Sequence, residues 1–136
     1  MKKLPVRILI ADDDKNLRKM LAGELRDSGF ETTEADNSLR AIEHLLNNEC
    51  DVLILDLSMP DIEGMEVLKK IKASDLPVEV VILTGNSTVS TAVEAMKLGA
   101  YDYLTKPFKL EELKVIVQKA FEKKQLLNEN LLLKTQ

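Results

Sequence analysis

Residues 6–14 read VRILIADDD, a short apolar run that stops at three consecutive carboxylates. A continuous apolar run of this length is typical of a strand that is buried on both faces, as the strands of parallel sheets are. The same pattern returns at residues 51–56, which read DVLILD. The sequence therefore predicts a parallel sheet whose inner strands carry acidic side chains at their carboxyl ends.

Further strand and helix signals alternate along the chain. The remaining strands are expected at residues 30–35, 78–83 and 101–104. The first of these is polar and Thr-rich, which suits a sheet edge, and Asp14 and either Asn37 or Ser38 can cap the first two helices. Strict alternation produces right-handed βαβ units. We predict an α/β fold, a flavodoxin-like, doubly wound, five-stranded parallel sheet of order 2-1-3-4-5 with five helices, the last one extended.

Apolar residues at helical spacing predict which helix faces are buried. The second helix would bury Leu39, Ile42, Leu45 and Leu46. The fourth helix would bury Val89, Ala92, Val93 and Met96.

Composition excludes several classes of protein. With 136 residues, 45% of them hydrophobic, the chain is sized for one packed domain. Its net charge of −4 argues against direct binding of nucleic acid or of a membrane surface, since both are anionic. Cys50 is the single cysteine, and no apolar stretch approaches the roughly 20 residues that span a bilayer. These features predict a soluble protein of the cytoplasm.

Polar side chains at the strand ends should meet at one rim of this sheet. Ligands of open parallel sheets bind beyond the carboxyl ends of the strands, where the strand order reverses. For the predicted order, that point lies between the first and third strands. The residues that reach this rim are Asp12 and Asp13 after the first strand, Asp56 ending the third, Thr84 ending the fourth and Lys106 after the fifth.

The three acids at this rim repel one another, and a hard divalent cation with oxygen ligands, Mg2+ above all, removes that penalty. Each rim residue also has a plainer interpretation. An acid after a strand can simply cap a helix, as we expect Asp14 to do, Lys106 can be a solvated lysine in a turn, and Thr84 can be an ordinary strand residue. The three acids together favour the metal, because grouping them costs stability without one.

Five short motifs match one known family in order. They are residues 10–14 (IADDD), 51–56 (DVLILD) with 59–61 (MPD) and Gly64, 81–85 (VILTG), 99–104 (GAYDYL) and 106–108 (KPF). With these motifs the chain resembles the response-regulator receiver domains of two-component systems, from Ile8 to about Phe121. The resemblance is greatest to the receivers of sigma-54-dependent (NtrC-like) transcriptional activators.

This resemblance implies a role for each rim residue. Asp56 would accept a phosphoryl group from the phosphohistidine of a partner sensor histidine kinase. Asp13, Asp56 and the main-chain carbonyl of Ser58 would hold Mg2+, and Asp12 would act on the ion through water. Lys106 would pair with the phosphoryl group. The chain would then be a phosphoacceptor regulatory domain that assists only its own phosphorylation and dephosphorylation, and not an enzyme.

Two residues would report the phosphorylation. Thr84 would bond to the phosphoryl group, and Tyr103 matches the aromatic residue whose ring moves inward as Thr84 shifts. The face formed by the fourth helix, the fifth strand and the fifth helix would then change shape. Without the resemblance, Tyr103 is better interpreted as a half-buried strand aromatic.

The last helix carries leucines beyond the predicted domain. From Leu110 to Leu133 there is neither Pro nor Gly, and Leu127 and Leu131 continue the helical spacing with Leu126 beside them. One interpretation is a frayed amphipathic end. Exposed leucines at this density instead predict a partner helix, most simply that of a second copy in a parallel coiled coil.

We therefore expect a receiver domain at residues 1–121 and a helical linker at residues 122–136. The linker would lead to an output domain, of the transcription-activating kind, that lies outside this chain. A homodimer would form through the linker and through the face of the fourth helix, fifth strand and fifth helix, and phosphorylation would change it.

Three other functions are weighed against this one. A haloacid-dehalogenase-like hydrolase also forms an aspartyl phosphate, but it needs a general acid two residues after the nucleophile, where this chain has Ser58. A flavodoxin-type flavin module needs a phosphate-binding first loop, and this chain has three aspartates there. An interaction domain that is never phosphorylated would not need the combination of Asp56, Lys106 and Thr84.

Overall fold

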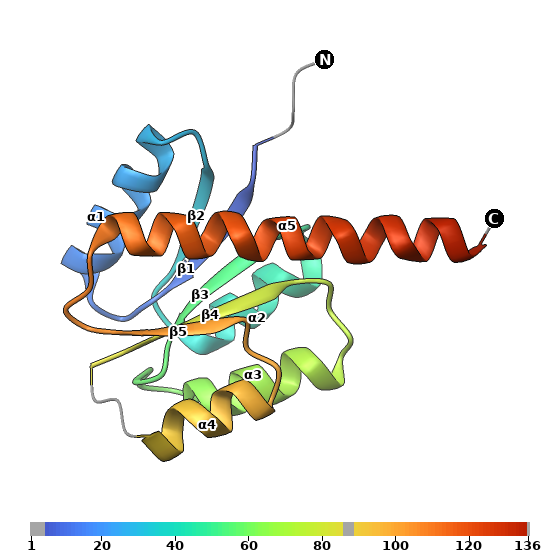
Figure 1. Cartoon of the computed structure of the whole chain (residues 1–136). Helices are drawn as coiled ribbons and strands as arrows, with labels where there is room; N and C mark the ends of the chain where they lie inside the picture. The colour runs from blue at the N-terminus through green and yellow to red at the C-terminus, as the bar shows by residue number, and fades with distance from the viewer. Residues whose placement is uncertain (1–4, 86–88, 136) are drawn as a thin grey trace.

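The computed structural model describes residues 5–85 and 89–135, except for the side chains of Val89 and of residues 128–135. Strands and helices alternate along the chain (Figure 1). The strands are β1 (Arg7–Ala11), β2 (Glu31–Ala35), β3 (Val52–Asp56), β4 (Glu79–Thr84) and β5 (Asp102–Thr105). The helices are α1 (Lys15–Asp27), α2 (Ser38–Asn47), α3 (Gly64–Ala73), α4 (Val89–Lys97) and α5 (Leu110–Thr135).

All five strands pair in parallel in the order β2-β1-β3-β4-β5, which confirms the predicted fold. β2 lies at one edge and alternates exposed with half-buried residues, as its Thr-rich sequence predicts. β1 and β3 are neighbours, with Ala11 opposite Leu55. The residues that follow these two strands therefore leave the sheet side by side, at the point where the strand order reverses.

Two hydrophobic layers cover the two faces of the sheet. Along β1, Ile8 and Ile10 point to the layer under α1 and α5, whereas Leu9 and Ala11 point to the layer under α2, α3 and α4. In Figure 1, α5 crosses above the sheet, and α3 and α4 lie below it. Because β3 is covered on both sides, all five of its residues are buried, including Asp56.

Polar side chains begin the first two helices as predicted. The Asp14 carboxylate accepts the Leu17 N–H at the start of α1. Asn37, one of the two predicted candidates, caps α2 by accepting the Arg40 N–H. These bonds satisfy backbone donors that have no partner within the helix.

The predicted buried faces of α2 and α4 were too wide. In α2, Leu45 is buried, but Leu39 is 54% exposed and Leu46 is 60% exposed. In α4, Val93 and Met96 are 45% and 43% exposed, and the side chain of Val89 lies outside the described residues. Each helix contacts the sheet with a narrow stripe, so apolar residues beside that stripe remain in contact with water.

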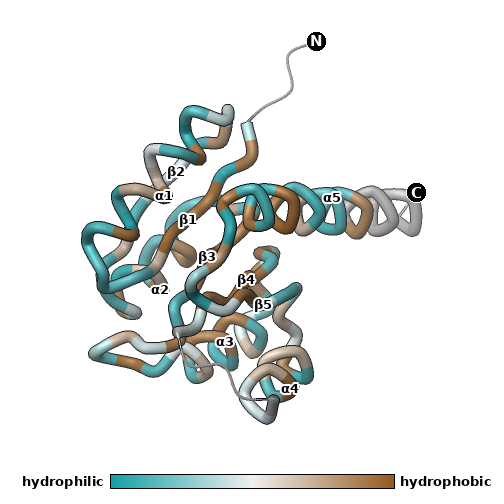
Figure 2. Tube along the Cα trace, turned by 60° about the vertical axis from the view of Figure 1, so that its left-hand side comes forward, coloured by the Kyte–Doolittle hydropathy of each residue, from teal (hydrophilic) through white to brown (hydrophobic). Residues whose placement is uncertain are grey.

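Figure 2 shows the inner strands as the continuously hydrophobic segments, with mixed or hydrophilic helices around them. Within residues 5–85 and 89–135, no helix combines the length and the apolar character that crossing a bilayer would require. α5 is the longest helix, and it continues well beyond the edge of the sheet (Figure 1). This confirms the predicted extension of the last helix.

A buried ion pair ties α5 to the amino-terminal end of β3. Lys124 donates to the Asp51 carboxylate at 2.6 Å and to the Cys50 carbonyl at 3.2 Å. Arg7 donates to the same carboxylate through its main-chain N–H at 2.8 Å. Burial by itself would raise the pKa of Asp51, but the hydrogen bonds from Lys124 and Arg7 outweigh it and the pKa lies below its usual value.

We expect Lys124→Met to lower the free energy of unfolding by about 2–3 kcal/mol at neutral pH, because it leaves a buried carboxylate with only Arg7 as a cationic partner. The loss should shrink as the pH falls below about 4, since a carboxylate with a lowered pKa contributes its stability only above that range. Urea unfolding measures both effects. Lys119→Met, at an exposed position of α5, is the control, and an equal loss in both variants would contradict the role of the ion pair.

Candidate functional site

Three carboxylates meet where the chain leaves β1 and β3. One oxygen each of Asp12, Asp13 and Asp56 lies within 4.8 Å of the others. Asp12 is fully buried and Asp56 is 3% exposed, whereas Asp13 faces solvent. The predicted acidic cluster is therefore present, with two of its members inside the protein and the third at its mouth.

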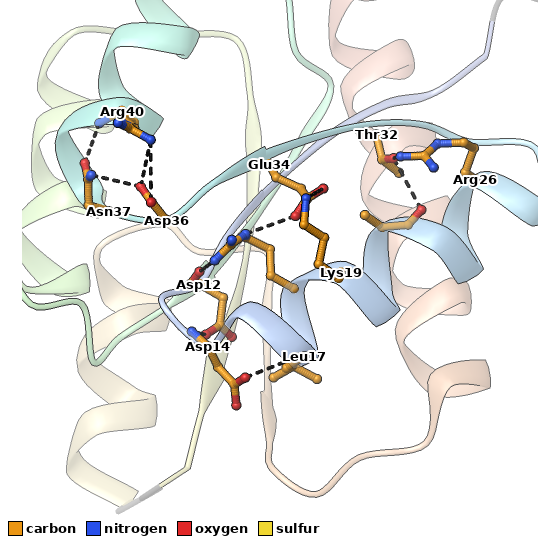
Figure 3. A network of polar contacts seen from close by, with 12 residues as sticks. Asp12, Asp14, Leu17, Lys19, Arg26, Thr32, Glu34, Asp36, Asn37 and Arg40 are labelled. Carbon is orange, nitrogen blue, oxygen red and sulfur yellow. Dashed lines mark hydrogen bonds and ion pairs between the residues drawn. The ribbon is translucent and has the colours of Figure 1, made fainter.

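The turn that carries Asp12 is fixed on several sides. Its N–H donates to the Ala35 carbonyl at 3.1 Å, and its carboxylate accepts the Asp14 N–H at 2.9 Å. The nearly buried Arg18 of α1 donates to the Asp12 carbonyl at 2.9 Å and to the Glu34 carboxylate at 3.0 Å. Figure 3 shows Asp12 and Glu34 within this network. Arg18 therefore holds the acidic turn against β2 and places a positive charge close to it.

Lys106 supplies a cation close to the acidic cluster. Its ammonium lies 3.2 Å from an Asp12 oxygen and 3.8 Å from an Asp56 oxygen. Its main-chain N–H donates to the Thr84 carbonyl at 2.8 Å, so the turn after β5 is attached to the end of β4. The Lys106–Pro107 peptide bond is cis. The ammonium therefore lies between the carboxylates of Asp12 and Asp56, and it forms no ion pair with Asp13 among the described contacts.

Asp56 is the less satisfied of the two buried acids. Burial raises its pKa above the usual value, the Asp12 charge adds to this effect, and the Ser58 N–H and the Lys106 ammonium offset part of it. The Ser58 N–H donates to one Asp56 oxygen at 3.1 Å. The other oxygen is the one near Lys106. The charged form of Asp56 is thus held at a cost, which a bound cation or a covalent bond at the carboxylate would remove.

The donor set fits Mg2+. The ion prefers oxygen ligands, keeps several waters and is usually bound by one or two carboxylates. Asp12, Asp13 and Asp56 offer carboxylate oxygens close enough to share one ion, and Asp13 is open to the solvent that would supply water ligands. Among the residues that the structure describes, no histidine or cysteine joins the cluster, so a softer metal has no advantage there.

Thr84 and Tyr103 line one narrow pocket beside α4. The same pocket is lined by Leu57, which directly follows Asp56, and by Ala92 and Ala95 of α4. Thr84 is 5% exposed and Tyr103 is half-buried. One small pocket is therefore shared by the end of β4, by Tyr103 of β5 and by the helix α4.

All the predicted rim residues lie at the carboxyl ends of the strands, and two further residues could not be found from the sequence. Arg18 gave no signal because a polar residue on an amphipathic helix usually faces water. Asp61 lies in one of the matching motifs but has no assigned role there. Its carboxylate accepts hydrogen bonds from the N–H groups of Ser38 and Leu39 at the start of α2. Arg18 joins the Asp12 carbonyl to the Glu34 side chain, and Asp61 binds main-chain N–H groups more than 20 residues away, so no local pattern indicates either contact.

Known proteins resemble this chain in sequence and in fold. The regulatory protein AtoC of Escherichia coli (strain K12) is 40% identical over 116 residues, which are 85% of this chain and 25% of AtoC. An NtrX-like response regulator of Rickettsia felis (strain ATCC VR-1525 / URRWXCal2) is 37% identical over 130 residues, 94% of this chain and 27% of the relative. The chain thus spans about a quarter of the length of these relatives.

A solved signal receiver domain from Vibrio parahaemolyticus superposes with a TM-score of 0.88 at 29% identity, covering 95% of this chain and 98% of that one. Residues 8–118 match the family described as the response regulator receiver domain. Receiver domains are regulatory phosphoacceptor domains of two-component systems, and they generally bind Mg2+ through acidic residues. Because the match covers most of its length, this chain belongs to the response regulator receiver domain family.

Proposed function

We propose that this chain is a phosphorylation-activated switch in which Asp56 accepts a phosphoryl group from the phosphohistidine of a sensor histidine kinase. The observation that carries the proposal is the meeting of Asp12, Asp13 and Asp56 within 4.8 Å, with the Lys106 ammonium beside two of them. A hydrolase of the haloacid-dehalogenase type gains no support, since the family match is to receivers.

The chain's own residues supply position and charge. We assign Mg2+ coordination to Asp13, Asp56 and the Ser58 carbonyl, with Asp12 acting through water. The bound ion would neutralise the oxygens of the incoming phosphoryl group. Lys106 would pair with the same group from the other side, because its ammonium already reaches Asp56. Phosphoryl transfer through a loose transition state needs in-line placement and charge neutralisation, and no acid–base residue.

Thr84 and Tyr103 are the proposed reporters. A phosphoryl group on Asp56 adds about two negative charges and three acceptor oxygens, which the Thr84 hydroxyl can approach from the end of β4. Thr84 and Tyr103 line the same narrow pocket, so a shift of the threonine would make room for the ring. The change would then reach the surface formed by α4, β5 and α5.

The longer relatives suggest the setting of this switch. We infer that residues 1–121 form the receiver, that residues 122–136 form a helical linker, and that an output domain of the transcription-activating kind follows. This is supported by the similarity to AtoC and to the NtrX-like regulator, of which the chain covers only about a quarter. The setting is cytoplasmic, as for a partner of a histidine kinase.

We expect the chain, incubated with Mg2+ and acetyl phosphate, to gain one phosphoryl group by intact-mass measurement. Asp56→Asn should gain none, because the amide is not a nucleophile for phosphorus at this site. Removing Mg2+ with EDTA should abolish the adduct as well. Asp14→Asn, which alters only the helix cap beside the cluster, is the matched control and should still be phosphorylated. An adduct that survives Asp56→Asn would refute the assignment.

Asp56→Asn should also stabilise the Mg2+-free protein at pH 7. The pKa of Asp56 is raised, so the folded protein favours its neutral form. The stability that this form contributes is fully present below the usual pKa of about 3.9 and is lost as the pH rises through the raised pKa. At pH 7 the buried charge of Asp56 is therefore a net cost to the free energy of folding. Urea unfolding in EDTA should show the gain, and added Mg2+ should close the gap by stabilising the wild type. Equal stability in EDTA would contradict a strained carboxylate.

We propose further that the linker helix forms a homodimer together with the α4, β5 and α5 surface. Leu126 and Leu127 are 60% and 49% exposed on α5 beyond the sheet. The side chains of the other predicted coiled-coil residues, including Leu131, lie outside the described residues. Paired burial of such leucines would provide the driving force for association, and phosphorylation would change its strength.

Leu127→Lys should therefore raise the dimer dissociation constant at least about tenfold, since each copy would lose more than about 1.4 kcal/mol of apolar burial. Sedimentation velocity over a range of concentrations, with and without phosphorylation, measures this. Gln125→Lys adds the same charge at an exposed neighbouring position and should change the constant less. If both variants behave alike, the leucine is not part of the interface.

A further inference from the structure

The loop between β3 and α3 carries Ser58, and its base is closed by backbone contacts. Leu57 N–H donates to the Leu83 carbonyl at 3.1 Å, and Gly64 N–H donates to the Leu57 carbonyl at 3.1 Å. Gly64 leaves no room for a side chain, because a Cβ there would lie 2.7 Å from the Leu57 Cα. These contacts fix the two ends of the loop but not its tip.

The tip is attached to the first turn of α2, 23 residues earlier in the chain. The Asp61 carboxylate accepts the Ser38 N–H at 2.9 Å with one oxygen and the Leu39 N–H at 3.0 Å with the other. The Ser38 hydroxyl donates to the Ile62 carbonyl at 2.6 Å. Three hydrogen bonds therefore join this loop to a helix that carries no residue of the acidic cluster.

This attachment is stronger than an ordinary surface contact. The bond from the Ser38 N–H, with that from Leu39, lowers the pKa of Asp61 to about 2. The carboxylate is therefore ionised at all physiological pH values, and it lies at the positive end of the α2 dipole. α2 has its own cap in Asn37, so Asp61 is not required to begin the helix. The main effect of the Asp61 hydrogen bonds is therefore to fix the position of the loop.

We propose that Asp61 is a positioning residue for the metal, because its hydrogen bonds to α2 hold the loop whose Ser58 carbonyl would bind the ion. The inference rests on the proposed function, in which that carbonyl binds Mg2+. Ser58 and Asp61 are separated by two residues only, so movement of the tip displaces the carbonyl. Ligand sets must be held to within about 0.5 Å. A loosened tip would thus weaken Mg2+ binding while the fold persists.

Asp61→Asn tests this directly, since it keeps the shape but removes the charge and one of two acceptor oxygens. The Mg2+ dissociation constant is measured by NMR titration of the amide signals. The Mg2+ concentration for half-maximal phosphorylation by acetyl phosphate is measured separately. We expect both values to rise about tenfold, the lower end of the range for residues that orient metal ligands. The rate at saturating Mg2+ should return close to that of the wild type, which a merely structural defect would not produce.

Two controls test whether loss of an α2 cap or loss of a negative charge in the loop is enough to weaken Mg2+ binding. Asn37→Ala removes the other cap of α2 and leaves the loop bonds intact. Glu63→Gln removes a negative charge from the same loop, where Glu63 makes no side-chain capping bond. Both should keep the Mg2+ affinity of the wild type. Ser38→Ala, which cuts the bond to the Ile62 carbonyl, should weaken Mg2+ binding in the same direction as Asp61→Asn.

An unchanged Mg2+ affinity in Asp61→Asn, or an equal loss in either control, would overturn the positioning role while leaving the phosphoacceptor assignment of Asp56 intact. A wild-type protein that neither binds Mg2+ nor gains a phosphoryl group would instead overturn the proposed function itself. The two failures are therefore distinguishable in one set of titrations.

Discussion

Like-charge repulsion among Asp12, Asp13 and Asp56 is the constraint around which the rest of the structure is arranged. The repulsion among three carboxylates with oxygens within 4.8 Å is partly offset by the Asp14 and Ser58 N–H groups, which bind Asp12 and Asp56, and by two nearby cationic side chains. Lys106 reaches two of the carboxylates, and Arg18 binds the carbonyl of the acidic turn. This compensation is incomplete, and the remaining negative charge is what favours a divalent cation and, with it, a phosphoryl group.

β3 carries a well-paired acid at one end and a poorly paired acid at the other. Asp51 precedes the strand and is bound by Lys124 at 2.6 Å and by Arg7, and its pKa is lowered. Asp56 ends the strand with an ammonium no nearer than 3.8 Å, and its pKa is raised. Both side chains are almost fully buried, so the difference lies in their partners. The well-paired Asp51 anchors α5, and the poorly paired Asp56 is the proposed phosphoacceptor.

The sequence predicts the sheet and its polar rim because both follow from apolar runs along the chain and from the rule that ligands of parallel sheets bind at the strands' carboxyl ends. Apolar runs that end in acids give the strands, and parallel pairing brings Asp12 and Asp56 together without any knowledge of contacts. The sequence could not predict Arg18 or Asp61, because their roles depend on contacts with the Glu34 side chain of β2 and with the backbone of α2. It also could not separate Leu45 from its exposed neighbour Leu46, since the width of the buried stripe is set by how closely the helix approaches the sheet.

A change at Asp56 could be transmitted through β3 and α5 or through α4 and β5, and packing favours the second pair. β3 is buried along its whole length, and α5 is fixed to its far end through Asp51, so a shift there would disturb a close-packed core. On the other side, β5 has only four residues, none of them fully buried, and α4 exposes Val93 and Met96. Displacing these elements costs fewer apolar contacts. Phosphorylation of Asp56 should therefore act on α4 and β5, with β3 and α5 as the rigid frame against which they move.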